Sequence, residues 1–564
     1  MDYKHKKIRL GDLLVESRVI TQEQLDRALE KQKGRNMKLG EILVDEGIIS
    51  EDDIATALCR QLNLEKIDLK SISIDQHVAK LVPVNVLKKY TMLPYAFHET
   101  NRNVLMVAME NPLDTYAQED ISIITNYQVE PVVATARDIM LAIDRIFGQV
   151  EVEDALSQYV KEKKLDIEDV SEEQDDSLNS SPIVKLVKEM IELAVRQRAS
   201  DIHIEPQEEM IMVRFRIDGV LHEKMNYNIS VLSAILARIK IIAGMDISEK
   251  RKPQDGRITQ VVDHVEYDIR VSSLPTIYGE KIVMRLAAKM ALTRDKQQLG
   301  FKDYELEQFD SIIHSPHGII LVTGPTGSGK STTLYTTLSE LNTSEVNIIT
   351  VEDPVEANIN GINQVQVNPK ADLTFVSALR SILRQDPDII MIGEIRDKET
   401  AQIAVQASIT GHLVVSTLHT NSSANTITRL EDMGVESYLI ADSVVGVIAQ
   451  RLVRKLCPDC KQLIEPTEEQ KKFLGLEHEK HPKIYGPCGC PKCDQTGYYG
   501  RTGIYEIMKV SPEIKRMIAK KQGATKLQEQ AIAEGMKTLE MSGIESCLAG
   551  ITSYDEIVKL SFEG

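Results

Sequence analysis

Residues 324–331, Gly324-Pro-Thr-Gly-Ser-Gly-Lys-Ser331, fit the phosphate-loop pattern GxxxxGK[ST]. They follow the apolar run Gly318 to Thr323, which predicts a buried strand. Apolar residues after the loop, at Leu334, Leu338 and Leu341, predict a helix. Glycines in this position let backbone N–H groups converge on phosphate oxygens, and the helix N-terminus adds its positive dipole end. The strand–loop–helix context favours a nucleoside triphosphate site over a glycine-rich turn that matches by chance.

The loop residues have distinct expected roles. Lys330 brings a compact positive charge to the β- and γ-phosphates, and the Ser331 hydroxyl is placed to ligate Mg²⁺. The residues expected to bind ATP are Gly324, Pro325, Thr326, Gly327, Ser328, Gly329, Lys330, Ser331 and Thr332.

Strand and helix patterns alternate from about Leu299 to Leu452, which predicts a parallel sheet. Strands are expected at 319–323, 347–351, 389–393 and 412–417. After the last three come Glu352-Asp-Pro-Val-Glu356, Glu394-Ile-Arg-Asp397 and Thr417-Leu-His-Thr420. A single loop glutamate is usually just solvated, but carboxyl ends of parallel strands share one edge, where such groups can hold Mg²⁺ and orient water. The catalytic candidates are Glu394, Glu352, Glu356, His419 and Lys330.

Size and charge limit the other possibilities. A chain of 564 residues predicts three or four domains. The formal net charge of -18 argues against a dedicated nucleic-acid binder, although it leaves room for a local basic patch. No apolar run of about 18 residues occurs and the first residues lack the apolar core of a signal peptide, so we expect a cytoplasmic protein that reaches a membrane only through partners.

Five of the seven cysteines lie between Cys457 and Cys493. Cys457-Pro-Asp-Cys460 and Cys490-Pro-Lys-Cys493 form two CxxC pairs, the arrangement typical of a tetrahedral Zn²⁺ site. In a reducing cytoplasm a metal explains this clustering better than disulfides or redox chemistry. Cys488 could replace Cys490 as a ligand.

The first 61 residues contain an internal repeat with an offset of 29 residues. Arg9-Leu-Gly-Asp-Leu-Leu-Val15 returns as Lys38-Leu-Gly-Glu-Ile-Leu-Val44, and each copy is followed by a helix pattern. Neither unit can bury its apolar face alone, so the two should pack as a quasi-symmetric pair. From periodicity alone this is a small helical docking domain.

The rest of the N-terminal half reads as two α/β modules. Residues 103–108 and 129–133 are strand-like, and a helix is expected from Thr135, a plausible N-cap. An acidic linker follows, with seven acidic residues between Asp166 and Asp176. From Pro182 to about Ala288 a second module places arginines on its strands, at Arg214, Arg216, Arg257, Arg270 and Arg285. A strand arginine is usually a surface residue, but five near a nucleotide site could reach a neighbour's γ-phosphate.

Together these motifs resemble the secretion ATPases, and more narrowly the assembly ATPase of type IV pili or its type II secretion counterpart. The resemblance covers essentially the whole chain and rests on the phosphate loop, Val351 to Glu356, Ile392 to Asp397, Ser416 to Thr420 and the CxxC pairs. It implies a RecA-like phosphate-loop motor domain preceded by a PAS-like α/β module and an N-terminal α/β regulatory or docking domain, with a zinc-knuckle insertion. The expected domains are 1–148, a linker at 149–181, 182–290, and 291–564 with the knuckle at 457–493 and the C-terminal helices.

The resemblance also implies an oligomeric motor. The chain would form a homo-hexamer in which the second module swings against a neighbour's motor domain, and Arg257, Arg270 and Arg285 match the family's nucleotide-reaching arginines. It would act on an inner-membrane platform protein and associated cytoplasmic assembly proteins, adding pilin subunits to a fibre. The knuckle and the long N-terminal domain are features of assembly motors rather than retraction motors.

The N-terminal repeat resembles a tandem motif that binds cyclic di-GMP. The matching positions, with Lys38 standing where the pattern has arginine, are Arg9, Leu10, Gly11, Leu25, Leu29, Gln32, Lys38, Leu39, Gly40, Ile54, Leu58 and Gln61. Lysine cannot stack or fork on a guanine as arginine does. In addition, Arg18 occupies a position where the pattern has a turn glycine, which the second unit keeps as Gly47. Docking without a ligand is the alternative for this domain.

The leading hypothesis is a mechanochemical ATPase, with pilus assembly favoured over type II secretion by the cyclic di-GMP-like repeat. A regulatory nucleotide-binding scaffold with negligible turnover is disfavoured by the intact Lys330, Glu352, Glu394 and His419. A nucleic-acid motor is disfavoured by the net charge and by the absence of an aromatic–basic groove pattern.

Overall fold

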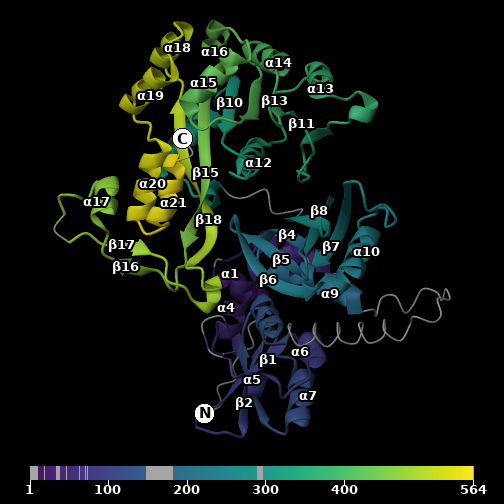
Figure 1. Ribbon diagram of the computed structural model, residues 1–564. Helices are drawn as coiled ribbons and strands as arrows, with labels where there is room; N and C mark the ends of the chain where they lie inside the picture. The colour runs from purple at the N-terminus through teal and green to yellow at the C-terminus, as the bar shows by residue number, and fades with distance from the viewer. Residues whose placement is uncertain are drawn as a thin grey trace. The chain divides into compact units, whose positions relative to one another are not determined.

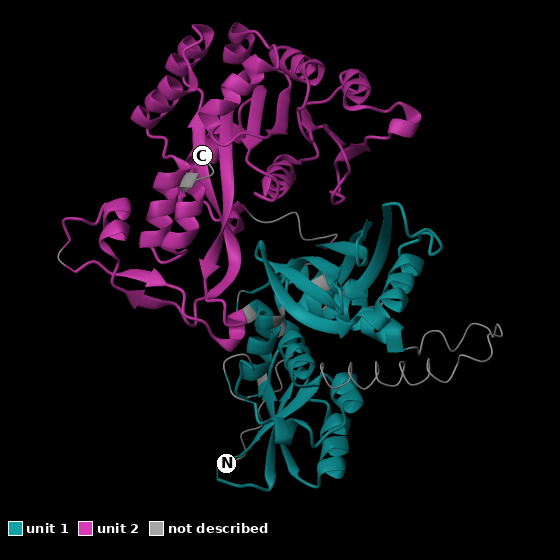
Figure 2. Cartoon of the chain, viewed as in Figure 1, with its two compact units in different colours: residues 1–287 teal, residues 288–564 magenta. Residues whose placement is uncertain are grey.

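The computed structural model describes residues 10–17, 19–32, 39–45, 48–62, 64–69, 72, 74–98, 100–147, 182–263, 265–288, 296–479 and 481–562. The chain divides into two compact units, residues 1–287 and 288–564 (Figure 2). The expected acidic linker lies outside the described residues, as do Arg9, Arg18, Lys38 and Gly47.

Four helices at the start of the first unit realise the internal repeat. They are α1 (Leu10–Glu16), α2 (Gln22–Gln32), α3 (Leu39–Asp45) and α4 (Glu51–Leu62). Helix α1 packs on α4 and α2 on α3, and one core joins residues of both repeats, among them Leu14, Leu25 and Leu43. A Cβ on Gly11 would lie 2.7 Å from Leu25 Cδ1, and one on Gly40 would lie 3.0 Å from Ile54 Cδ1. The repeat is therefore a quasi-symmetric pair whose two glycines let helices approach closely.

A small α/β layer follows. It contains α5 (Gln76–Ala79), α6 (Val84–Tyr90), β1 (Met92–Phe97), β2 (Val104–Met109), α7 (Thr115–Thr125), β3 (Gln128–Val133) and a helix over 136–147. The sheet order is β1-β2-β3, with the first pair antiparallel and the second parallel. Thr135 Oγ1 accepts a hydrogen bond from the Asp138 N–H at 3.2 Å, which confirms its expected capping role.

The remainder of the first unit is an antiparallel sheet covered by two helices. Its elements are α9 (Pro182–Arg196), β4 (Ala199–Pro206), β5 (Met210–Ile217), β6 (Val220–Asn228), α10 (Leu232–Ile242), β7 (Gln254–Val262), β8 (Val265–Thr276) and β9 (Gly279–Ala288). The sheet order is β6-β5-β4-β9-β8-β7. Strand residues alternate, so that Ile202, Phe215 and Ile269 lie in the core while their neighbours face the other side.

The second unit is built on a seven-stranded sheet of order β12-β11-β13-β14-β10-β15-β18 (Figure 1). Its strands are β10 (Gly318–Thr323), β11 (Ile348–Glu352), β12 (Asn363–Gln366), β13 (Ile389–Ile392), β14 (Leu413–Leu418), β15 (Val444–Leu456) and β18 (Tyr498–Lys509). All neighbours pair in parallel except β15 and β18, which are antiparallel. The four expected strands are confirmed to within a residue or two. The sequence patterns predict neither β12 nor β15.

Helices cover both faces of this sheet and form two cores. The helices are α11 (Asp303–Ile313), α12 (Lys330–Leu341), α13 (Phe375–Ile382), α14 (Lys398–Ile409), α15 (Ser423–Asp432), α16 (Ser437–Ser443), α18 (Pro512–Ala519), α19 (Ala524–Ala533), α20 (Leu539–Leu548) and α21 (Tyr554–Phe562). Between β15 and β18 the chain inserts β16 (Gln462–Ile464), α17 (Glu468–Leu474) and β17 (Ile484–Gly486). The insertion carries the CxxC pairs.

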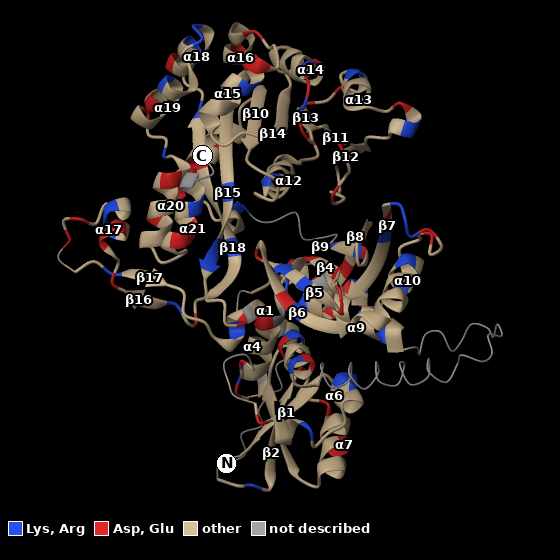
Figure 3. Cartoon of the chain, viewed as in Figure 1, with Lys and Arg blue, Asp and Glu red and all other residues tan. Residues whose placement is uncertain are grey.

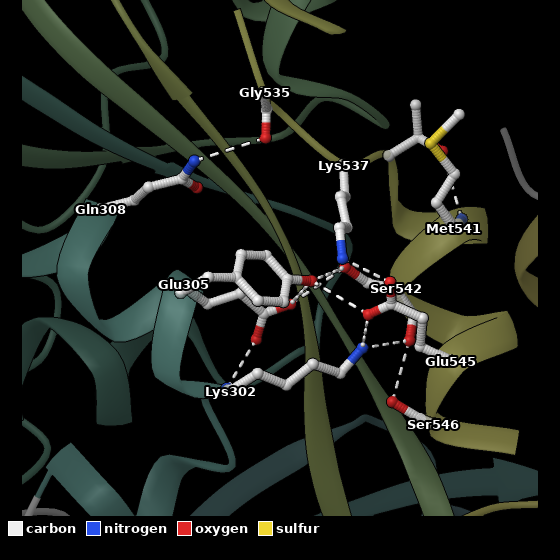
Figure 4. A network of polar contacts seen from close by, with 11 residues as sticks. Lys302, Glu305, Gln308, Gly535, Lys537, Met541, Ser542, Glu545 and Ser546 are labelled. Atoms are coloured by element: carbon white, nitrogen blue, oxygen red, sulfur yellow. Dashed lines mark hydrogen bonds and ion pairs between the residues drawn. The ribbon is translucent and has the colours of Figure 1, made fainter. Parts of the chain in front are cut away.

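A polar network ties the C-terminal helix α20 to the beginning of α11 (Figure 4). The buried Glu305 carboxylate accepts hydrogen bonds from Ser542 Oγ at 2.9 Å and from the Lys302 N–H at 2.9 Å. Lys302 Nζ in turn donates to Glu545 at 2.9 Å, and Lys537 pairs with the same carboxylate. Because Ser542 and Glu545 are 237 and 243 residues from Glu305 and Lys302, the network fastens α20 to α11 across a large separation in sequence.

Charged residues of both signs are interspersed along the elements of both units rather than segregated by sign (Figure 3). Within the described part of the chain, every helix is too short or too polar to cross a lipid bilayer.

Candidate functional site

The phosphate loop begins where a fully buried strand ends. Every residue of β10 is buried, and β10 has parallel neighbours on both sides, β14 and β15. The loop residues 324–329 follow, and α12 begins at Lys330. Thr323 Oγ1 accepts a hydrogen bond from the Thr420 N–H at 2.9 Å, which holds the loop after β14 beside the start of the phosphate loop.

The Lys330 side chain folds back over the loop. Its Nζ donates to the carbonyl oxygens of Gly324 at 2.7 Å and Pro325 at 3.0 Å. Burial lowers the pKa of Lys330 to about 8, with the charge of Arg451 adding to this and that of Glu394 opposing it. A polyphosphate beside the ammonium group would favour its charged form, so the loop is electrostatically prepared for an anion.

Two of the expected catalytic side chains meet at the adjacent strand ends. Glu394 follows β13, and its Oε2 lies 3.5 Å from Nε2 of His419, which follows β14. Arg396 forms an ion pair with the other carboxylate oxygen of Glu394. Thr417 Oγ1 donates to the Gly393 carbonyl at 2.7 Å, so the two strand ends are cross-linked just before these residues. Lys330 begins α12 just beyond β10, and β10, β13 and β14 are parallel, so all three side chains lie at the carboxyl edge of one sheet.

Glu352, at the end of β11, has a different environment from Glu394. It is buried, and its carboxylate accepts hydrogen bonds from Tyr335 on α12, from Thr350 at 2.6 Å and from Gln364 at 3.1 Å. Burial and the bond to Glu352 raise the pKa of Tyr335, which stays a donor. Its hydroxyl also accepts from the Glu356 N–H at 3.0 Å. This network fixes the segment 352–356 against the phosphate-loop helix.

Tyr335 and Gln364 were not among the residues expected in the site. Tyr335 stands five residues beyond Lys330 on α12 and is not one of the apolar residues, Leu334, Leu338 and Leu341, from which the helix is predicted. Gln364 lies on β12, a strand that the sequence does not predict. Neither residue belongs to a motif, so no local signal identifies them.

The arginines of the second module gather on one face of its sheet. Arg257 on β7 and Arg270 on β8 are directly opposite each other in register, while Ile258 and Ile269 beside them are buried on the helix-covered face. Arg285 on β9 extends from the same outer face and pairs with Asp201 at 3.1 Å. The adjacent β5 adds Arg214 and Arg216 by the same alternation.

The four thiols of the CxxC pairs converge. The Cys457–Cys490 and Cys460–Cys493 sulfur atoms are each 3.8 Å apart, and the Cys490–Cys493 sulfurs 3.7 Å apart. All four ligand atoms lie within 4.8 Å of one another, and the exposed Cys488 is not in the group. A tetrahedron with Zn–S bonds of about 2.3 Å has edges of about 3.8 Å, whereas a disulfide requires about 2.05 Å. The donor set fits Zn²⁺.

The residues expected to bind cyclic di-GMP divide into two groups in the described helices. Leu25 and Gly40 are buried in the core between the repeats. Leu29 is 39% exposed on α2, and Gln32, Ile54 and Leu58 are half-buried. Leu10 and Leu39 begin their helices, and Gly11 packs on Leu25. Of Gln61 only its place on α4 is described.

The chain matches known protein families and known relatives. Residues 176–559 match the family described as Type II/IV secretion system protein, and residues 62–153 match the MshEN domain, which begins just after the repeat. The chain is 43% identical to the Type IV pilus assembly ATPase PilB of Myxococcus xanthus over 98% of each chain. It is 44% identical to the Type II secretion system ATPase E of Vibrio cholerae over 84% of this chain and 97% of that one.

The solved structure of the Legionella pneumophila ATPase DotB covers 67% of this chain and 96% of its own, with a TM-score of 0.51 at 22% identity, which shows a shared fold. Together with the phosphate loop and the strand-end residues, these matches identify the chain as a member of the type II/IV secretion system family of phosphate-loop, ATP-hydrolysing enzymes.

Proposed function

We propose that the chain works as a homo-hexamer that converts ATP hydrolysis into mechanical work on an inner-membrane platform protein and so assembles type IV pilus fibres. The observation that carries the proposal is that Lys330, Glu394 and His419 lie at the carboxyl edge of one parallel sheet, with Glu394 and His419 paired at 3.5 Å. It occurs in a chain that aligns over 98% of its length with a pilus assembly ATPase.

The second candidate is the equivalent motor of a type II secretion system. Its support is the nearly equal identity to a type II secretion ATPase, 44% against 43%. The aligned length favours pilus assembly, because the secretion relative matches 84% of this chain and the pilus relative 98%. In either case the motor would be cytoplasmic and held at the inner membrane by the platform and by associated assembly proteins.

The strand-end residues would divide the work of hydrolysis. Mg²⁺ held at Ser331, when bound, would neutralise charge on the phosphates. Lys330 would hold the β- and γ-phosphates, and Glu394 would orient the attacking water and accept its proton. His419, beside Glu394, would sense whether the γ-phosphate is present. Glu352 and Glu356 would position the segment that faces the nucleotide, because Glu352 is already saturated by buried donors.

The arginine face supports a role between subunits. Arg257 and Arg270 are directly opposite each other across β7 and β8, and Arg270 pairs with Asp268 at 3.9 Å. The guanidinium groups on this face can bind the phosphate oxygens of a polyanion in a bidentate manner. We propose that Arg257, Arg270 and Arg285 reach the ATP of a neighbouring subunit in the hexamer, which would couple the nucleotide state to movement of the second module.

The glutamate assignment predicts a separation of binding from turnover. Replacing Glu394 by Gln keeps the size and the hydrogen-bonding capacity but removes the base, so kcat should fall by about 100-fold or more. ATP affinity, measured by titration with a fluorescent analogue, should change by less than about threefold, because the phosphate contacts remain. Glu513→Gln, on the first turn of α18 with a 44% exposed side chain, is the matched control and should hydrolyse ATP normally. Normal turnover by the Glu394→Gln protein would show that another residue is the base.

We further propose that the N-terminal repeat binds cyclic di-GMP. The exposed Leu29 on α2 offers an apolar surface for a guanine base, beside the half-buried Gln32. The ligand would then bridge the two repeats that already share a core.

Calorimetric titration of the full chain with cyclic di-GMP, with ADP present in excess to fill the phosphate loop without turnover, should show saturable binding. Leu29→Asp should abolish this binding, because a charged carboxylate would replace the apolar surface proposed to lie against the guanine base. Ile124→Asp, a comparably exposed position on α7 outside the repeat, should bind normally. If the folded wild-type chain gives no heat, the domain is a docking module and the motor assignment is unaffected.

The thiol cluster supports a structural Zn²⁺ site. Chain purified without chelators should contain about one zinc per subunit by elemental analysis, consistent with a closed four-thiolate site. Cys490→Ser should lose the metal and lower the melting temperature, because ligand loss removes folding free energy. Cys488→Ser is the matched control, and its zinc content should be unchanged since that thiol is exposed and lies outside the cluster. Equal loss from both variants would refute the assigned ligand set.

A further inference from the structure

The side chain of Gln450 lies against the phosphate loop, although Gln450 belongs to β15 and follows Ser328 by 122 residues in sequence. It is only 1% exposed. Its Nε2 donates to the Ser328 carbonyl oxygen at 2.8 Å, and its Oε1 accepts from Thr333 Oγ1 at 2.9 Å. One amide therefore connects the middle of the loop to the first turn of α12.

The bond to Ser328 determines how one peptide unit of the loop is turned. The Ser328 carbonyl and the Gly329 N–H belong to the same peptide, which is trans. In a trans peptide these two groups point in opposite directions. Holding the carbonyl toward β15 therefore turns the Gly329 N–H away from β15, to the side on which a phosphate loop binds its phosphates.

The surroundings allow only one arrangement of this amide. A carbonyl oxygen can only accept, so the NH₂ group of Gln450 must face Ser328 and its oxygen must face the Thr333 hydroxyl. Gly329 has φ +91°, and a Cβ there would lie 3.2 Å from Gln450 Nε2. The glycine thus provides both the left-handed backbone and the space that the amide occupies.

We propose that Gln450 is a positioning residue for nucleotide binding: it fixes the Ser328–Gly329 peptide so that its N–H is presented to the β-phosphate. Thr333 orients the amide from the other side. The inference rests on the proposed nucleotide site at residues 324–332 and adds to it a buried support from the neighbouring strand.

The test compares two nucleotides on the full-length protein. Gln450→Glu keeps the size and the acceptor for Thr333 but, when ionised, cannot donate to Ser328, and Gln450→Met removes both bonds without adding a charge. The dissociation constant of ADP should rise about tenfold in each, the effect of losing one well-placed hydrogen bond in a buried site. AMP, which has no β-phosphate, should bind within about threefold of its wild-type affinity, because the affected N–H serves the distal phosphates.

Two further variants distinguish a failure of the positioning role from a failure of the proposed nucleotide site. Thr333→Val removes the other bond of the same amide and leaves the Ser328 bond, so it should lower the melting temperature while shifting ADP binding less than Gln450→Glu does. Lys330→Ala tests the nucleotide site itself and should lose ADP binding. If Lys330→Ala binds ADP normally, the proposed site is wrong.

If Lys330→Ala loses ADP and folded Gln450→Glu binds it like wild type, only the positioning role fails. An equal loss of ADP and AMP affinity in the Gln450 variants would also overturn it, because general disruption of the site would be the cause. Should Gln450→Met fail to fold, the nearly isosteric glutamate variant decides the question.

Discussion

The motor unit depends on the burial of one strand between two parallel neighbours. Strand β10 has no exposed residue and pairs with β14 on one side and β15 on the other. The residues that follow β10 therefore leave the sheet at its carboxyl edge. Because β11, β13 and β14 run in the same direction, their following residues arrive at that edge as well. The phosphate loop, Glu394 and His419 are thus brought together by backbone hydrogen bonding and apolar burial, before any contact among the polar side chains. The Thr417–Gly393 and Thr323–Thr420 bonds then refine the alignment.

Local patterns predicted the parts of this architecture whose causes are local. The four strands 319–323, 347–351, 389–393 and 412–417 are apolar runs, and the CxxC pairs have their spacing written in the chain, so both were identifiable. Contacts that depend on distant pairing were not. Gln450 reaches Ser328 across 122 positions from a strand, β15, that no pattern predicts, and the donors to Glu352 include Gln364 on the unpredicted β12. A buried glutamine has no sequence signature that separates it from an exposed one, and only the assembled sheet reveals its partners.

Features of the two units indicate how the binding and hydrolysis of ATP would be coupled to movement. The second unit supplies a loop poised for phosphates, in which the pKa of Lys330 is lowered to about 8 by burial until an anion arrives. The first unit supplies a sheet face on which Arg257 and Arg270 oppose each other. A bound triphosphate would favour the charged form of Lys330 and would offer oxygen acceptors to the guanidinium groups. The nucleotide would thereby link the α/β module at 182–288 of one subunit to the motor sheet of the next.

The most direct test of this link is to mix two inactive variants, Arg270→Ala and Lys330→Ala, and measure ATP hydrolysis by the mixed oligomers. In a mixture, an Arg270→Ala subunit offers an intact phosphate loop and a Lys330→Ala neighbour offers an intact arginine. If sites are completed between subunits, the mixture should recover activity that neither variant has alone. A mixture as inactive as its two parents would show that the arginines do not act on a neighbour's nucleotide, and would contradict the account.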